Sequence, residues 1–384
     1  MKDPAIKKES VCVSVDKDSR HGVVTPVYPS TAFQYVDEGQ QYYPRYFNTP
    51  NQDSVTTKLA KLERTEDGVL FGSGMAAIST AMLSLLSPGD HVVCLDGLYG
   101  GTHKFLTSEL ERLGISFSFA GSTVDELAAA INGDTKMIYV ESPTNPTMTC
   151  VDLAAVAKLA KESGCVSVID NTFASPICQT PADLGIDIVI HSGTKYLGGH
   201  SDLTCGAVLG PSDLMDGVRQ KALHYGGTTN SLTCYLIERS LKTLAVRVQR
   251  QCENAMTVAT ALEQHVLVGN VFYPGLNSSP YHEIASRQMD QYGGMLSFEL
   301  SDPAMVGRFL ESLQIITPAL SLGGVESTVC VPGLTSHRGV PREERERVGI
   351  TDSLIRYSVG IEHIDDLIGD LETAIQSAAN TVNA

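Results

Sequence analysis

The sequence contains no tryptophan, few basic residues and no long apolar run. No window approaches the roughly 20 consecutive apolar residues that span a membrane, and the first ten residues, MKDPAIKKES, lack the apolar stretch of a signal peptide. Its 28 lysines and arginines stand against 44 aspartates and glutamates, and the formal net charge of -16 repels nucleic acid and anionic lipid. We therefore expect a cytoplasmic protein that acts on a small molecule, with no nucleic-acid or membrane partner.

Cysteines are present but carry no spacing pattern. The nine cysteines are scattered along the chain, and no two of them form a CxxC pair. An odd total without paired spacing favours neither a zinc site nor a disulfide framework. We expect reduced cysteines in the core and no metal ion.

The length of 384 residues exceeds that of a usual single domain, so we expect two folded units. Residues 1–50 alternate turn formers with aromatics, a pattern that favours an extended N-terminal arm. Residues 51–245 alternate short β-branched runs with helical patterns, which predicts a large α/β domain with a mainly parallel central sheet. The spacing over residues 236–265 predicts one long helix that leads into a smaller α+β domain, residues 246–384.

Polar residues end three of the predicted strands. The strand VSVID ends in Asp170, and DIVIHS leads into the segment SGTK, which ends in Lys195. The strand MIYVES contains Glu141 and runs on to Asn145. Open α/β sheets bind ligands at the carboxyl ends of their strands, so we expect these side chains to share one site.

A glycine turn precedes an alanine-rich helical segment in FGSGMAA, which begins at Phe71. A helix that starts here leaves backbone N–H groups free to receive a phosphate. The run does not match the dinucleotide pattern GxGxxG, because Met75 and two alanines follow Gly74. An ordinary turn before a helix is the alternative interpretation.

Lys195 lies in the loop HSGTKYLGGHSD, where small and hydroxyl-bearing residues leave access for a carbonyl ligand. Desolvation lowers the pKa of a lysine and frees its amine as a nucleophile and base, as a Schiff-base cofactor requires. Asp170, a carboxylate at the end of a central strand, needs a partner such as a protonated pyridine nitrogen. A solvated loop lysine and a helix N-cap are the alternatives. Together with the phosphate turn, these features describe pyridoxal 5'-phosphate.

The chain resembles the Cys/Met-metabolism pyridoxal-phosphate enzymes, the family of cystathionine γ-lyase, cystathionine β-lyase, cystathionine γ-synthase and methionine γ-lyase. The resemblance spans about residues 20–375 and is carried by motifs in family order: GSGMAAIS, LDGLYGGT, ESPTNP, VIDNTFASP, HSGTKYLGGHSD, SLGGVES and LIRYSVGIE. It implies the aspartate-aminotransferase-like fold (fold type I) and a homotetramer built as a dimer of dimers. Tyr43 and Arg45 of YYPRY match a family pair that reaches across the dimer interface to the neighbour's cofactor phosphate, so the sites are shared.

The resemblance also assigns cofactor contacts within one subunit. It implies that Tyr99 stacks on the pyridine ring and that Asn145 bonds the phenolic oxygen; a core aromatic is the alternative for Tyr99. It implies phosphate contacts from the backbone of Gly74 and Met75 and from the hydroxyl groups of Ser192 and Thr194. Arg356 and Ser321, with Asn145, are implied to hold the substrate carboxylate, whereas a lone strand arginine would otherwise form a surface salt bridge.

The expected reaction is cleavage of a carbon–sulfur bond, most directly β- or γ-elimination of cystathionine to a thiol amino acid, ammonia and a 2-oxo acid. Lys195 would act as the base, and Tyr99 would assist at the leaving sulfur. Leu320 stands where cystathionine γ-lyases of the family often have glutamate, and Gly101 stands where methionine γ-lyases typically have cysteine. The alternatives are a γ-replacing synthase or sulfhydrylase, a methionine γ-lyase and a cofactor-binding relative without activity. The chain also reads Asn48-Thr49-Pro50 where most members read Asn-Pro-Thr.

Overall fold

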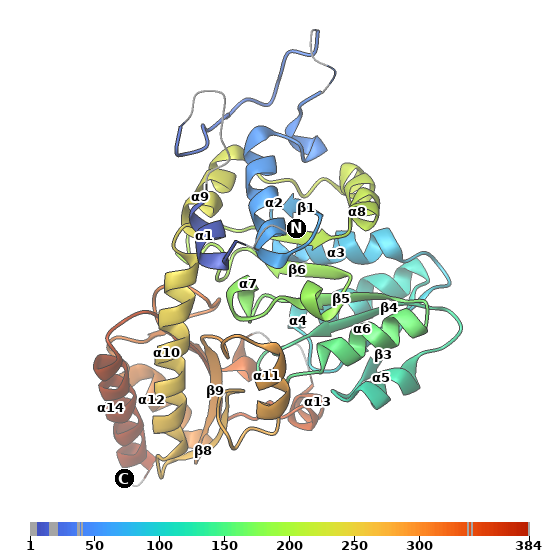
Figure 1. Ribbon diagram of the computed structural model, residues 1–384. Coiled ribbons are helices and arrows are strands. Elements are labelled where there is room, and N and C mark those ends of the chain that lie inside the picture. The colour runs from blue at the N-terminus through green and yellow to red at the C-terminus, as the bar shows by residue number, and fades with distance from the viewer. Residues whose placement is uncertain are drawn as a thin grey trace.

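The computed structural model describes residues 6–14, 22–36, 39, 41–335, 338 and 341–382. Its larger sheet has seven strands in the order β1-β7-β6-β5-β4-β2-β3 (Figure 1). The strands from β6 to β3 run parallel, whereas β7 runs antiparallel to β1 and β6, so the predicted mainly parallel sheet is confirmed. The strands are β1 (Asp67–Phe71), β2 (His91–Leu95), β3 (Ser116–Ala120), β4 (Thr135–Glu141), β5 (Val166–Asp170), β6 (Ile188–Ser192) and β7 (Gly206–Gly210).

Helices cover both faces of this sheet, as two consecutive residues of β6 show. His191 bonds Glu63 of α2 on one face, while Ser192 contacts Gly74 at the start of α3 on the other. The central strands are buried on both sides and therefore read as continuous apolar runs. The helices around the sheet are α2 (Pro50–Glu63), α3 (Gly74–Leu85), α4 (Gly100–Lys104), α5 (Val124–Ala130), α6 (Leu153–Glu162), α7 (Ser175–Cys178), α8 (Ser212–Tyr225) and α9 (Ser231–Leu241).

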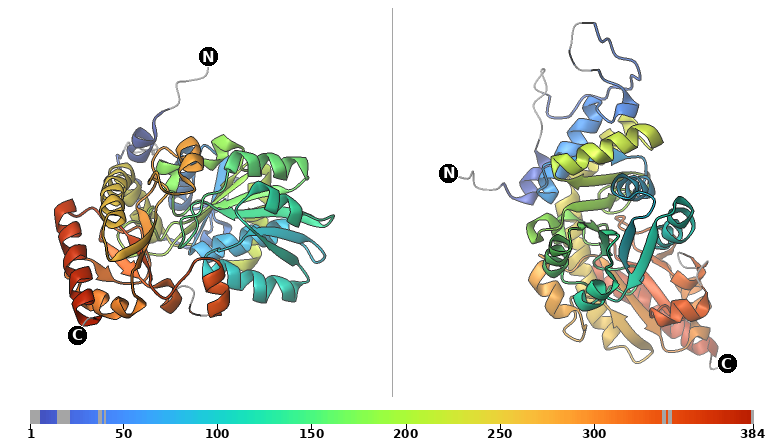
Figure 2. Two further views of the ribbon diagram at one scale, coloured as in Figure 1. Left: turned by 90° about the horizontal axis from the view of Figure 1, so that it is seen from below. Right: turned by 90° about the vertical axis from the view of Figure 1, so that its right-hand side faces the viewer.

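A second, five-stranded sheet in the order β10-β11-β12-β9-β8 lies to one side of the first with its own helices (Figure 2). Its hydrophobic cluster is separate from that of the first sheet. The strands are β8 (Val268–Phe272), β9 (Met295–Leu300), β10 (Thr317–Pro318), β11 (Thr328–Cys330) and β12 (Leu354–Ser358), and the helices are α11 (His282–Gln288), α12 (Val306–Ser312), α13 (Arg342–Arg347) and α14 (Ile364–Val382). Among the helices of the described residues, none combines the length and apolar character needed to cross a membrane.

The prediction of one long helix over residues 236–265 is wrong, because α9 ends at Leu241 and α10 (Leu244–Glu263) begins three residues later. The carbonyl of Ser240 accepts from the amide and hydroxyl of Thr243, at 3.1 and 3.2 Å, and from Nη2 of Arg247 at 3.0 Å. These donors occupy the carbonyl at the point where the helix would continue. In Figure 1, α10 runs from α9 down beside the second sheet, and it contributes to both hydrophobic clusters.

The N-terminal segment is only partly extended. Residues 8–13 form α1 (Lys8–Val13), which packs on α2 and α10 and buries Cys12. Residues 22–36 have no helix or strand and expose several apolar side chains. Residues 1–5, 15–21, 37–38 and 40 of the predicted arm lie outside the described part of the chain. The boundaries at residues 50 and 245, the second of which falls in the first turn of α10, stay predictions.

Candidate active site

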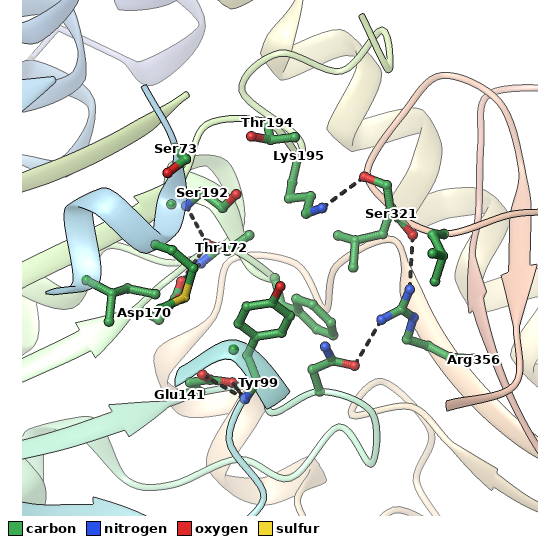
Figure 3. A pocket seen from close by; sticks show the side chains of 18 of the residues that line it. Ser73, Tyr99, Glu141, Asp170, Thr172, Ser192, Thr194, Lys195, Ser321 and Arg356 are labelled. Carbon is green, nitrogen blue, oxygen red and sulfur yellow. Dashed lines mark hydrogen bonds between the residues drawn. The ribbon is translucent and has the colours of Figure 1, made fainter. Parts of the chain in front are cut away.

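A cavity of about 520 Å³ opens at the carboxyl ends of β4, β5 and β6, between the two sheets (Figure 3). Its walls come from both halves of the molecule. Residues of the first sheet and its loops face the segment Leu320–Leu322 and the β12 residue Arg356. The predicted site residues that line it are Gly74, Met75, Tyr99, Asn145, Asp170, Ser192, Thr194, Lys195, Leu320, Ser321 and Arg356.

Lys195 is the only lysine among the described residues that line the cavity. Its Nζ donates a hydrogen bond to Oγ of Ser321 at 2.9 Å (Figure 3). Burial, followed by the nearby charge of Arg356, lowers the pKa of Lys195 to about 8, while Asp170 acts in the opposite direction. The amine is therefore far easier to deprotonate than that of a solvated lysine, contrary to the alternative interpretation.

Asp170 ends β5 inside the cavity. Its Oδ1 accepts from the amide of Thr172 at 3.0 Å and from the hydroxyl of the same residue. Within the described part of the chain, no hydrogen bond uses Oδ2. Burial raises the pKa of Asp170, while the bonds from Thr172 lower it. A buried carboxylate with one free oxygen suits a cationic N–H group more than it suits solvent, and the next helix, α7, starts too late for Asp170 to cap it.

The first turn of α3 faces the same cavity. Ser73 caps the helix by accepting from the amide of Ala76 at 3.1 Å, and the N–H groups of Gly74 and Met75 precede any helical acceptor. A Cβ on Gly74 would lie 2.8 Å from Cβ and 2.9 Å from Oγ of Ser192, so only glycine leaves this surface open. The hydroxyl of Thr194 donates to the carbonyl of Cys205 at 3.3 Å, so it bonds the protein backbone in this structure.

The ring of Tyr99 borders the cavity and the residue is 41% exposed, which disagrees with the alternative of a core aromatic. Its amide nitrogen lies 3.0 and 3.1 Å from the two carboxyl oxygens of Glu141 (Figure 3). A Cβ at Gly101 would stand 2.5 Å from Cε1 of Tyr99 and 3.0 Å from Sδ of Met75. The ring thus occupies the space that a side chain at position 101 would need.

Arg356 holds two other lining residues from its place on β12. Its Nη1 donates to Oδ1 of Asn145 at 3.1 Å, and its Nη2 donates to the carbonyl of Ser321 at 3.0 Å. Ser321 has a left-handed backbone with a φ of 80°, which is uncommon for a serine and is often found at functional sites. Leu320 beside it is 66% exposed. Arg356 is buried and not a surface ion pair, and burial lowers its pKa.

Tyr43 and Arg45 do not line this cavity of their own chain. Nη1 of Arg45 donates to the carbonyl of Leu223 in α8 at 2.8 Å, and the guanidinium lies against the rings of Tyr43 and Tyr46. Their predicted reach into a neighbouring subunit stays a prediction.

Several lining residues carry no prediction from the sequence. They are Ser73, Ile78, Pro143, Thr172, Phe173, Leu322 and Thr335, whereas the sequence placed Glu141 among the strand-end side chains without a role and used Gly101 only to compare subfamilies. Glu141 and Thr172 had a usable signal, because one ends a predicted strand and the other follows Asp170 by two residues. The described residues contain no group of three or more histidine, cysteine, aspartate or glutamate side chains placed to hold a metal ion.

These features fit pyridoxal 5'-phosphate on chemical grounds. The glycine-lined helix start offers N–H donors to a phosphate, Asp170 offers a free oxygen to a pyridinium nitrogen, and Lys195 offers an amine of lowered pKa to an aldehyde. Fold and site together define a protein of the class that holds this cofactor on a lysine.

Comparison with known proteins gives the family. The model for "Cys/Met metabolism PLP-dependent enzyme" matches residues 9–376, and the chain belongs to this family, whose cofactor is pyridoxal 5'-phosphate. It is 44% identical to a cystathionine β-lyase of Coxiella burnetii over 360 residues, 92% of this chain and 93% of the relative. A crystal structure of cystathionine γ-lyase from Lactobacillus plantarum, complexed with L-serine, has a TM-score of 0.94 and 39% identity over 97% of this chain and 100% of its own. The corresponding values for a cystathionine γ-synthase structure from Xanthomonas oryzae pv. oryzae are 0.94 and 35%, over 98% and 99%. The predicted family and fold type I architecture are confirmed.

Proposed function

We propose that this enzyme is a carbon–sulfur lyase of sulfur amino-acid metabolism that eliminates a thiol from cystathionine by β- or γ-cleavage. One observation carries the proposal: Nζ of Lys195 lies 2.9 Å from Oγ of Ser321, and the carbonyl of Ser321 accepts from Arg356. Ser321 thereby links the amine of Lys195, a base of lowered pKa, to the guanidinium of Arg356. This arrangement suits removal of the Cα proton from an amino acid whose carboxylate is bound beside it.

The proposed cofactor contacts follow from the cavity walls. The N–H groups of Gly74 and Met75, with the hydroxyl of Ser192, would hold the phosphate, and Thr194 would contribute once its hydroxyl turns from Cys205. Asp170 would pair with the ring nitrogen, and the opposite charge would reverse the rise in its pKa. Tyr99 would stack on the ring, Asn145 would bond its phenolic oxygen, and Lys195 would hold the cofactor through its amine.

The protein residues would divide the work of elimination among them. When bound, the cofactor supplies an electron-accepting ring that acidifies the Cα proton of an amino acid. Arg356 would bind the substrate carboxylate through its planar fork, aided by Ser321 and Asn145. Lys195 would take the Cα proton and move it during γ-cleavage, and Tyr99 would assist at the leaving sulfur.

The names of two relatives and the glycine at position 101 favour cystathionine over methionine as the substrate, whereas the apolar Leu320 does not. Two of the relatives reported above are named cystathionine lyases. A cysteine at position 101 has no room while the ring of Tyr99 stays in place, because even a Cβ there would overlap Cε1. Leu320 offers an apolar wall of substantial exposure and no charge, so the distal ammonium of cystathionine would need another partner.

We further propose a cytoplasmic homotetramer, a dimer of dimers in which Tyr43 and Arg45 complete the cofactor phosphate site of a neighbouring subunit. Tyr43 is 41% exposed and lies beside Arg45, a few residues after the segment 22–36 that exposes apolar side chains. Analytical ultracentrifugation of the holoenzyme tests the assembly. An Arg45→Ala variant that binds pyridoxal 5'-phosphate as tightly as wild type would contradict the shared site.

Product analysis tests the reaction. The purified holoenzyme is incubated separately with cystathionine, methionine, cysteine and O-acylhomoserine plus cysteine, and 2-oxo acid, ammonia and thiol are measured. We expect the highest kcat/KM for 2-oxo acid release from cystathionine. Inert cystathionine, with consumption of the acylhomoserine and cysteine, would instead assign the γ-replacement reaction of the similar Xanthomonas synthase. Bound cofactor without turnover of any amino acid would indicate a relative without activity.

A further inference from the structure

Glu141 is a buried carboxylate at the cofactor cavity to which the proposed reaction gives no task. It ends β4 directly opposite Asp170, its in-register neighbour on β5, and it is 5% exposed. In the described part of the chain no ion pair includes it, and its hydrogen bonds come from one donor, the amide of Tyr99. Burying a carboxyl group beside a second carboxylate costs free energy, so we expect Glu141 to have a structural or functional role that offsets this cost.

The bonds to Tyr99 indicate that reason. Both carboxyl oxygens of Glu141 lie within 3.1 Å of a single backbone nitrogen, at 3.0 and 3.1 Å. Tyr99 is the residue at which the chain leaves the β2 loop and enters α4, so this contact fixes the direction in which its side chain starts. The two residues are 42 positions apart in the sequence, and the adjacency of β2 and β4 brings them together.

The ring of Tyr99 is located from the other side by Gly101. The Cε1 atom lies where the absence of a side chain at position 101 leaves space, close to Sδ of Met75. The rest of the residue is open to the cavity, with 41% of its surface exposed. The hydrogen bond from the Tyr99 amide to Glu141 therefore constrains the backbone of Tyr99, and the space left at Gly101 accommodates its ring. Both contacts bear on how the ring can lie flat on a cofactor.

We infer that Glu141 is a positioning residue that acts through Tyr99, holding the aromatic ring at the height and angle that stacking on pyridoxal 5'-phosphate requires. This inference rests on the proposed function, in which Tyr99 stacks on the cofactor. Glu141 serves as a hydrogen-bond acceptor and not as a charge. Burial, and then the charge of Asp170, raise the pKa of Glu141 well above its ordinary value.

If Glu141 acts as a hydrogen-bond acceptor, a substitution that keeps the acceptor should be tolerated and one that removes it should not. Glu141→Gln keeps a carbonyl oxygen for the Tyr99 amide at nearly the same volume, whereas Glu141→Leu keeps the volume and removes the acceptor. We expect Glu141→Leu to weaken binding of pyridoxal 5'-phosphate to the cofactor-free protein, and to lower kcat, by about 10-fold each, the order of the effect of one partly buried, unpaired amide. Glu141→Gln should stay within about 3-fold of wild type on both.

A double-mutant cycle shows whether Glu141 works through Tyr99. Glu141→Leu is combined with Tyr99→Ala, and the dissociation constant of pyridoxal 5'-phosphate is measured by equilibrium dialysis for all four proteins. Glu141→Leu should weaken binding less than about 2-fold when the ring is already absent. Glu126→Leu is the matched control, because Glu126 also accepts from a backbone amide, that of Thr123 at 3.1 Å, but at the exposed start of α5. It should leave the dissociation constant unchanged.

Two outcomes overturn the inference. A Glu141→Gln enzyme as impaired as Glu141→Leu would assign the role to charge, and full additivity with Tyr99→Ala would show that Glu141 does not act through the ring. If Glu141→Leu fails to fold, Gly101→Ala perturbs the same ring from its other side. It should weaken cofactor binding in the wild-type background and not in Tyr99→Ala. A wild-type enzyme that is inactive on every amino acid would refute the proposed function. Dialysis needs no turnover, so the effect of Glu141 on cofactor binding could still be measured.

Discussion

The lowered pKa of Lys195 should set the rate at which the cofactor-free protein captures pyridoxal 5'-phosphate. Only the neutral amine attacks the aldehyde, and deprotonation with a pKa of about 8 makes that form available as the pH rises through 8. At pH 7 about one amine in ten is neutral, against about 0.03% for the ordinary lysine pKa of 10.5. The capture rate at neutral pH should therefore exceed that of a solvated lysine by about 300-fold from this effect alone.

Stopped-flow absorbance measures the capture rate constant between about pH 6 and about pH 10. Nα-acetyllysine with the same cofactor serves as the reference amine and removes the titration of the cofactor itself. We expect the protein's rate to rise about tenfold per pH unit below 8 and to level above it. A midpoint close to that of acetyllysine would refute the reasoning.

Two variants test the causes of the lowered pKa of Lys195, and they should shift the midpoint of the capture rate in opposite directions. The cation of Arg356 disfavours the ammonium form, so Arg356→Gln should raise the midpoint, which stays below 10.5 because burial is the larger cause. The carboxylate of Asp170 favours the ammonium form, so Asp170→Asn should lower the midpoint. Midpoints that move together, or do not move, would show that local charge does not control Lys195.

Other substitutions address the remaining walls of the site. Arg356→Lys keeps the charge but loses the planar fork, so KM for the amino acid should rise about 10- to 100-fold in steady-state assays, while inhibition by an amine without a carboxylate should not change. Gly74→Ala should weaken pyridoxal 5'-phosphate binding at least about 10-fold in dialysis, because the new methyl overlaps Ser192. Its control is Gly217→Ala in α8, where a Cβ meets no described atom within 4 Å. This variant should raise stability by about 0.5–1 kcal/mol in urea unfolding. Dialysis against a chelator should leave the activity of the holoenzyme intact, and a loss restored by a metal ion would contradict the expectation of a metal-free site.

The central strands were predictable because burial on both faces gives them continuous apolar runs that end in polar residues. The edge pair β1 and β7 was not, and the reason is partly steric. A Cβ at Gly206 would lie 2.1 Å from the carbonyl oxygen of Ser73, so the close approach of β7 to α3 requires glycine there. Glycines at such contacts remove the β-branched residues from which a strand is recognised.

The break between α9 and α10 could not be predicted for a different reason. No proline or glycine marks it, and the apolar spacing continues through it. One of the three donors to the carbonyl of Ser240 at the break is Arg247, whose side chain also donates, at 2.9 Å, to the carbonyl of Tyr196 beside Lys195. The same arginine therefore contributes to the helix end and supports the lysine loop, a tertiary effect that a periodicity argument does not contain.

The residues of the site also differ in whether local sequence or long-range contacts reveal their roles. Lys195 and Asp170 could be singled out because each stands at the end of a recognisable strand, in a local sequence that suits its task. Glu141 stands in the same kind of place, yet its partner Tyr99 becomes visible only when β2 is known to lie beside β4. Strand order follows from long-range pairing and not from local pattern. When a polar residue ends a predicted strand and has no partner in its own segment, its role therefore depends on residues at the end of a neighbouring strand. Only the structure identifies those residues.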